Sequence, residues 1–329
     1  MYHICLVAGD GIGQEVVPAT REVLEALGLP LSFSEARAGW ECFQQEGKSV
    51  PTETLAKIRQ ADATLAGAFT SPKKKVDGFF SAIRTMRHEL NLFANLRPAR
   101  SRPIQGSFKD VDMLMVRENS EGLYVAQERR YANVAIADAV VTKEASARIA
   151  EVALQEARKR RKKLAIIHKA NVLPVTTGLF LETAYEVAQH YPDVECYDLI
   201  VDAAAMLLVR QPEGFDVMVT TNLFGDILSD LMAGLVGGLG LAPSANIGAQ
   251  AAIFEPVHGS APDIAGQGIA NPMATVLTAA MMLEHLGESQ AAIRLEQAVN
   301  SVLTTGPQTP DLGGDARTED ITQAIIDAL

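Results

Sequence analysis

The chain has 329 residues, of which 48% are hydrophobic and 21% charged, so it can build a large packed interior and lacks the composition of a disordered protein. Its formal net charge of −11 repels polyanions, which argues against nucleic acid as a partner. No apolar stretch reaches the length of about 20 residues that a membrane span requires. The opening residues do not resemble a secretory signal, and the three cysteines lack metal-ligand spacing, so we expect a cytoplasmic protein with free thiols.

The first third of the chain alternates between strand patterns and helix patterns. A short apolar run from His3 to Ala8 is followed by apolar residues at helical spacing up to Leu27. The same alternation predicts strands at 31–36, 63–69 and 92–96 and helices at 53–61 and 79–90. Such alternation is typical of an α/β sheet.

After Arg97-Pro98 the pattern changes. It predicts strands at 112–117, 164–168, 194–200 and 215–220, helices at 143–160, 172–190 and 223–235, and a segment of alternating β-branched and small residues at 131–142. Three helical stretches after residue 253 need a sheet to cover, and the first part of the chain has a sheet with few covering helices. We therefore expect a first lobe of residues 1–98 plus 251–329 and a second lobe of residues 99–250.

Two local features favour structural interpretations. The run Gly9-Asp10-Gly11-Ile12-Gly13 follows the first strand, but Val16 stands where the third glycine of a dinucleotide-binding loop belongs. We therefore predict a tight turn and not a conventional Rossmann fold. The basic run 158–163 is interpreted as a solvated helix end, whose cations favour the negative end of the helix dipole.

Four arginines form the first candidate site. Arg84 and Arg87 share one face of a predicted helix, and Arg97 and Arg117 lie at strand ends. Each alone is typical of a protein surface. Together they could converge on a small polycarboxylate, because a guanidinium binds a carboxylate as a fork.

A pair of carboxylates forms the second candidate site. Asp226 and Asp230 are four residues apart on one helix face, where like charges repel unless a divalent cation lies between them. Oxygen ligands suit Mg²⁺ or Mn²⁺, and Asp202 offers a third carboxylate. The alternative is a solvated acidic face.

The remaining candidates are a lysine, a tyrosine and a loop. Lys169 lies between a predicted strand and helix, where nearby cations would lower its pKa and let it accept a proton, although it could be merely exposed. Tyr124 could donate a proton. The loop 255–266, rich in proline and glycine, could present backbone groups to an adenosine or be purely structural.

Taken together in chain order, these motifs resemble those of the metal-dependent β-decarboxylating dehydrogenases of isocitrate and isopropylmalate. The resemblance covers nearly the whole chain. The resemblance rests on residues 9–13, 83–98, 117–119, 169–171, 222–230 and 255–266. It implies an α/β, isocitrate/isopropylmalate dehydrogenase-like fold with two lobes and a central cleft. It also implies a homodimer, or a tetramer of paired dimers, in which residues 131–142 pair across subunits as a β-arm.

The same resemblance implies roles for individual residues. Arg87, Arg97 and Arg117 would hold the malate carboxylates of a tricarboxylate substrate, and Tyr124 and Lys169 would be the acid–base pair. The metal would be held by Asp202, Asp226 and Asp230. Lys169 and Asp202 would come from the neighbouring subunit, so the active sites would be shared.

The cofactor contacts follow from the resemblance too. They are Ser71, Asn171 near the nicotinamide, His258, Gly259, Ser260, Ala261, Asp263, Ile264 and Asn271. The Asp263 carboxylate would accept hydrogen bonds from the ribose hydroxyls and repel a 2′-phosphate. We therefore expect NAD as the cofactor.

The segment from Phe79 to Arg84 is similar to that of family members that oxidise homoisocitrate. The cation of Arg84 implies a substrate with a long acidic tail, because an apolar tail would leave a guanidinium unpaired. We expect oxidative decarboxylation of (R)-homoisocitrate to 2-oxoadipate and CO₂, in lysine biosynthesis by the α-aminoadipate route, and also action on isocitrate. The alternatives are an isocitrate, 3-isopropylmalate or tartrate dehydrogenase, or a non-catalytic regulatory subunit.

Overall fold

The computed structural model describes residues 1–74 and 76–329, and the chain divides into two compact units. Unit 1 contains residues 1–92, 102–105 and 237–329, and unit 2 contains residues 93–101 and 106–236. These bounds differ from those of the expected lobes. Strand β11 (Pro243–Ile247) pairs with β12 (Ala252–Pro256) and so lies in unit 1. Strand β4 (Ala94–Arg100) pairs along its length with β5 (Asp112–Glu118) and so lies in unit 2.

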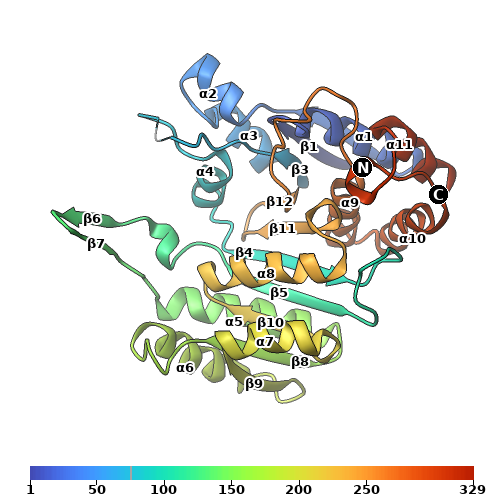
Figure 1. Ribbon diagram of the computed structural model, residues 1–329. Helices are drawn as coiled ribbons and strands as arrows, with labels where there is room; N and C mark the ends of the chain where they lie inside the picture. The colour runs from blue at the N-terminus through green and yellow to red at the C-terminus, as the bar shows by residue number, and fades with distance from the viewer. Residues whose placement is uncertain (75) are drawn as a thin grey trace. The chain divides into compact units, whose positions relative to one another are not determined.

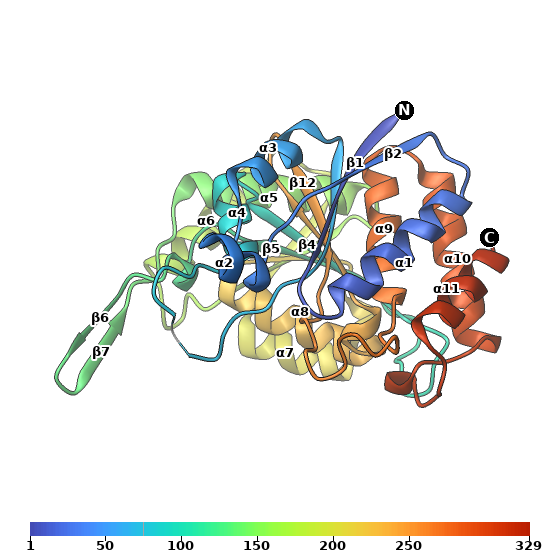
Figure 2. The same cartoon turned by 90° about the horizontal axis from the view of Figure 1, so that it is seen from above.

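Unit 1 is built on strands in the order β2-β1-β3-β12-β11. Strand β1 (Tyr2–Gly9) runs parallel to both β2 (Leu31–Glu35) and β3 (Ala63–Ala68). Helices α1 and α9 pack on one face, and α3 and α4 pack on the other (Figures 1 and 2). The helices are α1 (Gly13–Ala26), α2 (Trp40–Glu46), α3 (Thr52–Gln60), α4 (Ala82–Glu89), α9 (Met273–His285), α10 (Ser289–Thr305) and α11 (Thr318–Asp327).

Periodic burial explains these helices. In α1 the buried positions Val16, Val17, Val23 and Leu24 recur at helical spacing and face the sheet. Helix α9 is apolar almost all round, and it is buried on most sides because it lies between the sheet and helices α1 and α10.

Unit 2 has strands in the order β4-β5-β10-β8-β9, in which β4 is antiparallel and the other pairs are parallel. Helices α7 and α8 lie on one face, and α5 and α6 lie on the other (Figures 1 and 2). The elements are β8 (Lys163–His168), β9 (Glu195–Ile200), β10 (Val217–Thr220), α5 (Lys143–Arg158), α6 (Thr176–Ala188), α7 (Val201–Arg210) and α8 (Asn222–Val236). The short 3₁₀ turns of the two units are η1 (Leu123–Val125), η2 (Pro212–Gly214), η3 (Leu239–Leu241) and η4 (Pro310–Leu312).

A two-stranded hairpin extends from the rest of unit 2 (Figure 2). It consists of β6 (Glu128–Tyr131) and β7 (Val134–Ala137), and all residues of both strands are exposed. It begins three residues before the segment 131–142 for which the sequence predicts a β-arm, and it overlaps that segment up to residue 137.

Several elements differ from the sequence predictions. The strand predicted at 194–200 is β9, which starts one residue later and ends at Ile200, and helix α7 begins directly after it. Helix α2 and strands β11 and β12 were not predicted. The predicted helices at 79–90 and 172–190 begin later, at Ala82 and Thr176, because turns precede them. Helix α2 and strands β11 and β12 have only five to seven residues each, which is too few to show a repeating pattern of apolar residues.

The basic run 158–163 is not simply a solvated helix end. Arg158 pairs with Asp193 at 2.6 Å. The guanidinium of Arg160 is largely buried and pairs with the buried carboxylate of Asp216 at 2.9 Å. The prediction was wrong in this respect, because the acidic partners lie on other elements.

Two expectations from composition can be compared with the structure. Cys5 and Cys42 are free and buried, and Cys196 is free and partly buried, as predicted. None of the described helices combines the length and apolar character needed to cross a bilayer.

Candidate active site

Arg117 is the centre of a polar cluster in unit 2. It is the last residue but one of β5, and its side chain is 1% exposed. Its guanidinium donates to Asn222 Oδ1 at 2.7 Å and to Asp226 Oδ1 at 2.6 Å. A Cβ on Gly225 would lie 2.6 Å from Cγ of Arg117, so this glycine lets the arginine cross α8. These bonds offset the cost of burying the charge.

Arg97 joins the same cluster from β4. Its guanidinium lies 2.9 Å from Asp230 Oδ1 and 3.4 Å from Asp226 Oδ1. Burial raises the pKa of Asp230; the guanidinium of Arg97 lowers it and the neighbouring Asp226 carboxylate raises it further. Two of the four predicted arginines thus converge on both predicted carboxylates of α8.

Tyr124 contacts this cluster from the 3₁₀ turn η1. Its hydroxyl donates to Asp226 Oδ2 at 2.6 Å, and the Arg117 guanidinium carbon lies 5.0 Å from its ring centroid. Burial and then the hydrogen bond to Asp226 raise the pKa of Tyr124. The tyrosine is therefore protonated at neutral pH and can serve as a proton donor.

Lys169 and Asp202 form a second group in unit 2. Lys169 follows β8, Asp202 lies in the first turn of α7, and Nζ and Oδ1 are 2.5 Å apart. The hydrogen bond from Lys169 lowers the pKa of Asp202. Asn171, in the same turn as Lys169, is exposed.

The donor chemistry of α8 fits a hard divalent cation. Asp226 and Asp230 offer carboxylate oxygens on one helix face, with side chains 33% and 52% exposed. Within the described residues, however, no group of three His, Cys, Asp or Glu side chains is placed to hold a metal ion. One chain thus assembles two of the predicted carboxylates, while Asp202 pairs with Lys169.

The other two predicted arginines belong to unit 1, on α4. Arg87 is largely buried and donates to Asn246 Oδ1 and Glu255 Oε1, both at 3.0 Å. Arg84 lies one turn earlier and is exposed. The four arginines therefore form two pairs, each on its own unit.

The predicted adenosine loop, residues 255–266, contacts the glycine-rich turn 9–13 of unit 1. The N–H of Ile12 donates to the carbonyl of Ser260 at 2.9 Å, and Ala261 and Ile264 pack against the buried cluster that contains Ile12. Gly11 has φ +55°, and a Cβ there would lie 2.1 Å from the Ser260 carbonyl oxygen. The turn at 9–13 is thus structural, as predicted, and it supports the loop.

Further contacts place the remaining predicted cofactor residues. The hydroxyl of Thr70, next to the exposed Ser71, donates to Ser260 Oγ at 2.6 Å. Gly259 and Asp263 are exposed. Asn271 is buried and has structural contacts, because its Oδ1 accepts the N–H of Met273 at the start of α9 and its Nδ2 donates to Asp311.

His258 shows that this loop fits a ligand with a hydrogen-bond donor. Its Nδ1 lies 3.1 Å from the carbonyl oxygen of Gly259, and its buried Nε2 has no partner among the described residues. Burial lowers the pKa of His258, so the ring is neutral and Nε2 is an acceptor. The amino group of an adenine would satisfy it.

Sequence reasoning missed Asp10, which holds this region together. The residue is 2% exposed, and its carboxylate accepts the N–H groups of Trp40 at 2.8 Å, Glu41 at 3.0 Å and Thr70 at 2.8 Å. It therefore caps helix α2 and fixes the residue before Ser71. An acid between two glycines was the available signal, but its partners lie 30 or more residues away.

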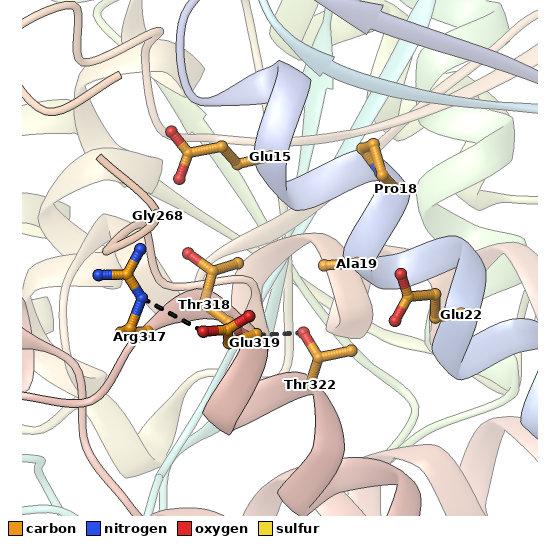
Figure 3. A pocket seen from close by; sticks show the side chains of 9 residues that line it. All are labelled: Glu15, Pro18, Ala19, Glu22, Gly268, Arg317, Thr318, Glu319 and Thr322. Atoms are coloured by element: carbon orange, nitrogen blue, oxygen red, sulfur yellow. Dashed lines mark hydrogen bonds and ion pairs between the residues drawn. The ribbon is translucent and has the colours of Figure 1, made fainter. Parts of the chain in front are cut away.

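A separate pocket of ≈ 220 Å³ lies between α1 and α11 (Figure 3). Glu15 and Pro18 of α1 face Arg317 and Thr322 across it, and Arg317 pairs with Glu319 at 3.3 Å. The residues that line this pocket include none of the predicted site residues.

The profile of the isocitrate/isopropylmalate dehydrogenase family matches residues 3–328. The chain belongs to this family. Isocitrate/homoisocitrate dehydrogenase of Thermus thermophilus is 65% identical over 100% of this chain and 98% of its own length. Homoisocitrate dehydrogenase of Methanocaldococcus jannaschii is 46% identical, with 100% and 98% covered.

A solved structure agrees with this family membership. The crystal structure of isocitrate dehydrogenase from Methylococcus capsulatus matches with a TM-score of 0.94 and 47% identity, over 100% of this chain and 99% of that one. The predicted family and its α/β fold class are therefore confirmed. Like its family, the chain is a dehydrogenase that acts on a hydroxy acid.

Proposed function

We propose that the chain catalyses the NAD-dependent oxidative decarboxylation of (R)-homoisocitrate to 2-oxoadipate and CO₂, and that it also accepts isocitrate. The name of the relative at 65% identity includes both substrates. The observation that carries the substrate assignment is Arg84, an exposed cation on α4. A guanidinium would bind the terminal carboxylate of the longer acid and disfavour an isopropyl group.

The residues of the site fit a divalent cation and a dinucleotide. Asp226 and Asp230 of one chain and Asp202 of a second copy would hold Mg²⁺ or Mn²⁺, which when bound polarises the substrate hydroxyl and stabilises developing negative charge. The loop with His258 and Asp263 would hold NAD, the hydride acceptor. The exposed carboxylate of Asp263 supports NAD over a cofactor with a 2′-phosphate.

The chain's own side chains supply binding and proton transfer. Arg97 and Arg117 would hold the carboxylates near the reacting carbons, with Arg87 as a third contact. Lys169 would take the proton of the substrate hydroxyl as hydride leaves for NAD. After CO₂ is lost, Tyr124, which its raised pKa keeps protonated, would protonate the carbon from which CO₂ departed.

The assembly that we propose is a cytoplasmic homodimer with shared active sites. Asp202 has two exposed apolar residues on its own helix, Met206 at 51% and Val209 at 48%, and Ile227 on α8 is 60% exposed next to Asp226. Exposed apolar side chains near Asp202 and Asp226 favour a surface that a second copy of the chain covers. The exposed hairpin residues Tyr131 and Val134 support a second contact.

A substrate panel tests the proposal. Purified enzyme, stripped of metal and resupplied with Mg²⁺ or Mn²⁺, is assayed for NADH formation on homoisocitrate, isocitrate, 3-isopropylmalate and tartrate. We expect homoisocitrate to give the highest kcat/KM and isocitrate to follow within about 10–200-fold, the effect of one methylene. Preference for isopropylmalate would contradict the role of Arg84. Undiminished turnover after metal removal would contradict the role of the aspartates.

The variant Arg84→Leu isolates the tail contact. Because a charge-assisted hydrogen bond contributes about 1.5–3 kcal/mol, kcat/KM on homoisocitrate should fall by roughly 10–100-fold. The rate on isopropylmalate should rise. The control is Arg294→Leu, an exposed helical arginine on α10, which should leave the substrate ratio unchanged. The role of Arg84 is wrong if both variants give the same ratio.

A further inference from the structure

The turn after β8 holds the backbone on both sides of Lys169. The N–H of Lys169 donates to Thr177 Oγ1 at 3.2 Å, and the carbonyl of Lys169 accepts the N–H of Leu173 at 2.8 Å. The N–H of Ala170, on the peptide that follows Lys169, donates to His168 Nδ1 at 3.0 Å. Since peptide groups are planar, fixing both flanking peptides restrains φ and ψ of Lys169 and the direction of its Cα–Cβ bond, from which the side chain starts.

The imidazole of His168 is held in one tautomer. Its side chain is 7% exposed, and its Nε2 lies 3.1 Å from Asp198 Oδ2. Because Nδ1 accepts the N–H of Ala170, the neutral ring carries its proton on Nε2 and donates it to Asp198. The other Asp198 oxygen accepts the hydroxyl of Tyr185 at 2.7 Å. Burial and this hydrogen bond raise the pKa of Tyr185 to about 12, so the tyrosine remains a donor.

We propose that His168 is a positioning residue for Lys169, and that it acts by offering Nδ1 as the acceptor for the N–H of Ala170. Asp198 and Tyr185 serve this role by keeping the ring proton on Nε2. The inference rests on the proposed function, in which Lys169 accepts the proton of the substrate hydroxyl. It assigns a functional reason to the hydrogen-bond chain that runs from Tyr185 through Asp198 to His168.

Two isosteric variants separate the two ring nitrogens. In His168→Asn the amide oxygen can take the place of Nδ1 and accept from Ala170, whereas in His168→Gln the amide nitrogen takes the place of Nε2 and reaches Asp198. We expect His168→Asn to keep kcat close to that of the wild type. We expect His168→Gln to lower kcat by about 10²-fold, the effect of a small misplacement of a reacting group, with little change in KM. Equal kcat in the two variants, or a larger loss in His168→Asn, overturns the proposal.

A measurement on the unmutated protein keeps the test decisive if a variant does not fold. Long-range ¹⁵N–¹H correlation spectra of the histidines should show the ring proton of neutral His168 on Nε2. A proton on Nδ1 overturns the proposal, because the ring could not then accept from Ala170.

Failure of the proposed function and failure of the role of His168 give different results. If the wild type oxidises none of the four hydroxy acids, the proposed function fails, while the tautomer measurement still tests the geometry around His168. If the wild type is active and the Asn and Gln variants behave alike, only the role of His168 fails.

Discussion

At the scale of single residues, the site depends on how a buried cation is accommodated. Arg117 is almost completely buried, and its guanidinium is held by Asn222 and Asp226. The side chain fits only because Gly225 has no Cβ, which would lie 2.8 Å from Cβ of Arg117. A buried charge that loses its partners is costly, so local packing here bears directly on the proposed chemistry.

Replacement of Gly225 by alanine should therefore damage both stability and activity. The added methyl displaces Arg117 from Asp226, so we expect a loss of about 1–3 kcal/mol in unfolding free energy by thermal or urea denaturation, despite the better helix propensity of alanine. Turnover should fall as well. The control is Gly178→Ala in α6, where no heavy atom lies within 4 Å of the added Cβ. A Gly225→Ala protein as stable and active as the wild type would refute the account of Arg117.

At the scale of elements, ion pairs join the end of α5 to the strands of unit 2. Arg160 pairs with Asp216, the residue directly before β10. It also pairs with Asp112, the first residue of β5, at 2.8 Å. Burial alone would raise the pKa of Asp112, but the guanidinium groups of Arg160 and Arg100 outweigh it and hold the pKa below its usual value. A carboxyl with a lowered pKa in the folded state stabilises the protein above its unfolded pKa, and this contribution is lost as pH falls.

The sign of this linkage predicts how Asp112→Asn behaves in acid. In the wild type, the ionised Asp112 carboxylate stabilises the folded state above about pH 4, near the ordinary aspartate pKa. This stabilisation disappears as the pH falls through the lowered pKa that Asp112 has in the folded protein. The variant should thus be less stable than the wild type at neutral pH, by about 0.5–1 kcal/mol because the pair is partly exposed, and the difference should shrink in acid. Urea unfolding at several pH values measures it, with the exposed Asp315→Asn as control. A difference that grows on acidification would show that the sign is wrong.

At the scale of the whole molecule, the proposed chemistry is distributed over both units and two copies. Unit 1 carries Arg84 and the adenosine loop, and unit 2 carries the carboxylates, Tyr124 and Lys169. The described residues of one chain gather no complete metal ligand set, and Asp202 lies on a helix with exposed apolar residues. The proposed homodimer with shared active sites would explain both observations.

Mixing two inactive variants tests whether sites are shared. If Lys169 acts in the partner's site, a mixed dimer of Lys169→Ala and Tyr124→Phe chains contains one intact site and one doubly defective site. Random reassociation should then restore about a quarter of wild-type activity, since half of the dimers are mixed and each has one working site. Each variant mixed with itself serves as the control. No recovery, with mixed dimers verified by mass spectrometry, would place Lys169 and Tyr124 in the same chain's site.

Local sequence patterns sufficed for much of the fold and for the identity of the candidate residues. The alternation of strand and helix follows from burial that repeats along the chain, so β1, α1, β8 and α8 lie close to their predicted positions. The family motifs are likewise short runs of residues, and their order along the chain can be recognised without any knowledge of contacts.

The partners of polar groups required the folded chain. Asp10 accepts hydrogen bonds from residues 30 and 60 positions away, and Arg160 reaches an aspartate 56 positions away. Hydrogen bonds and ion pairs between distant residues have no period along the sequence, because they depend on where whole elements pack. For that reason the contacts that hold the predicted adenosine loop, the burial of Arg117 and the hydrogen-bond chain next to Lys169 are decided only by the way strands and helices pack together.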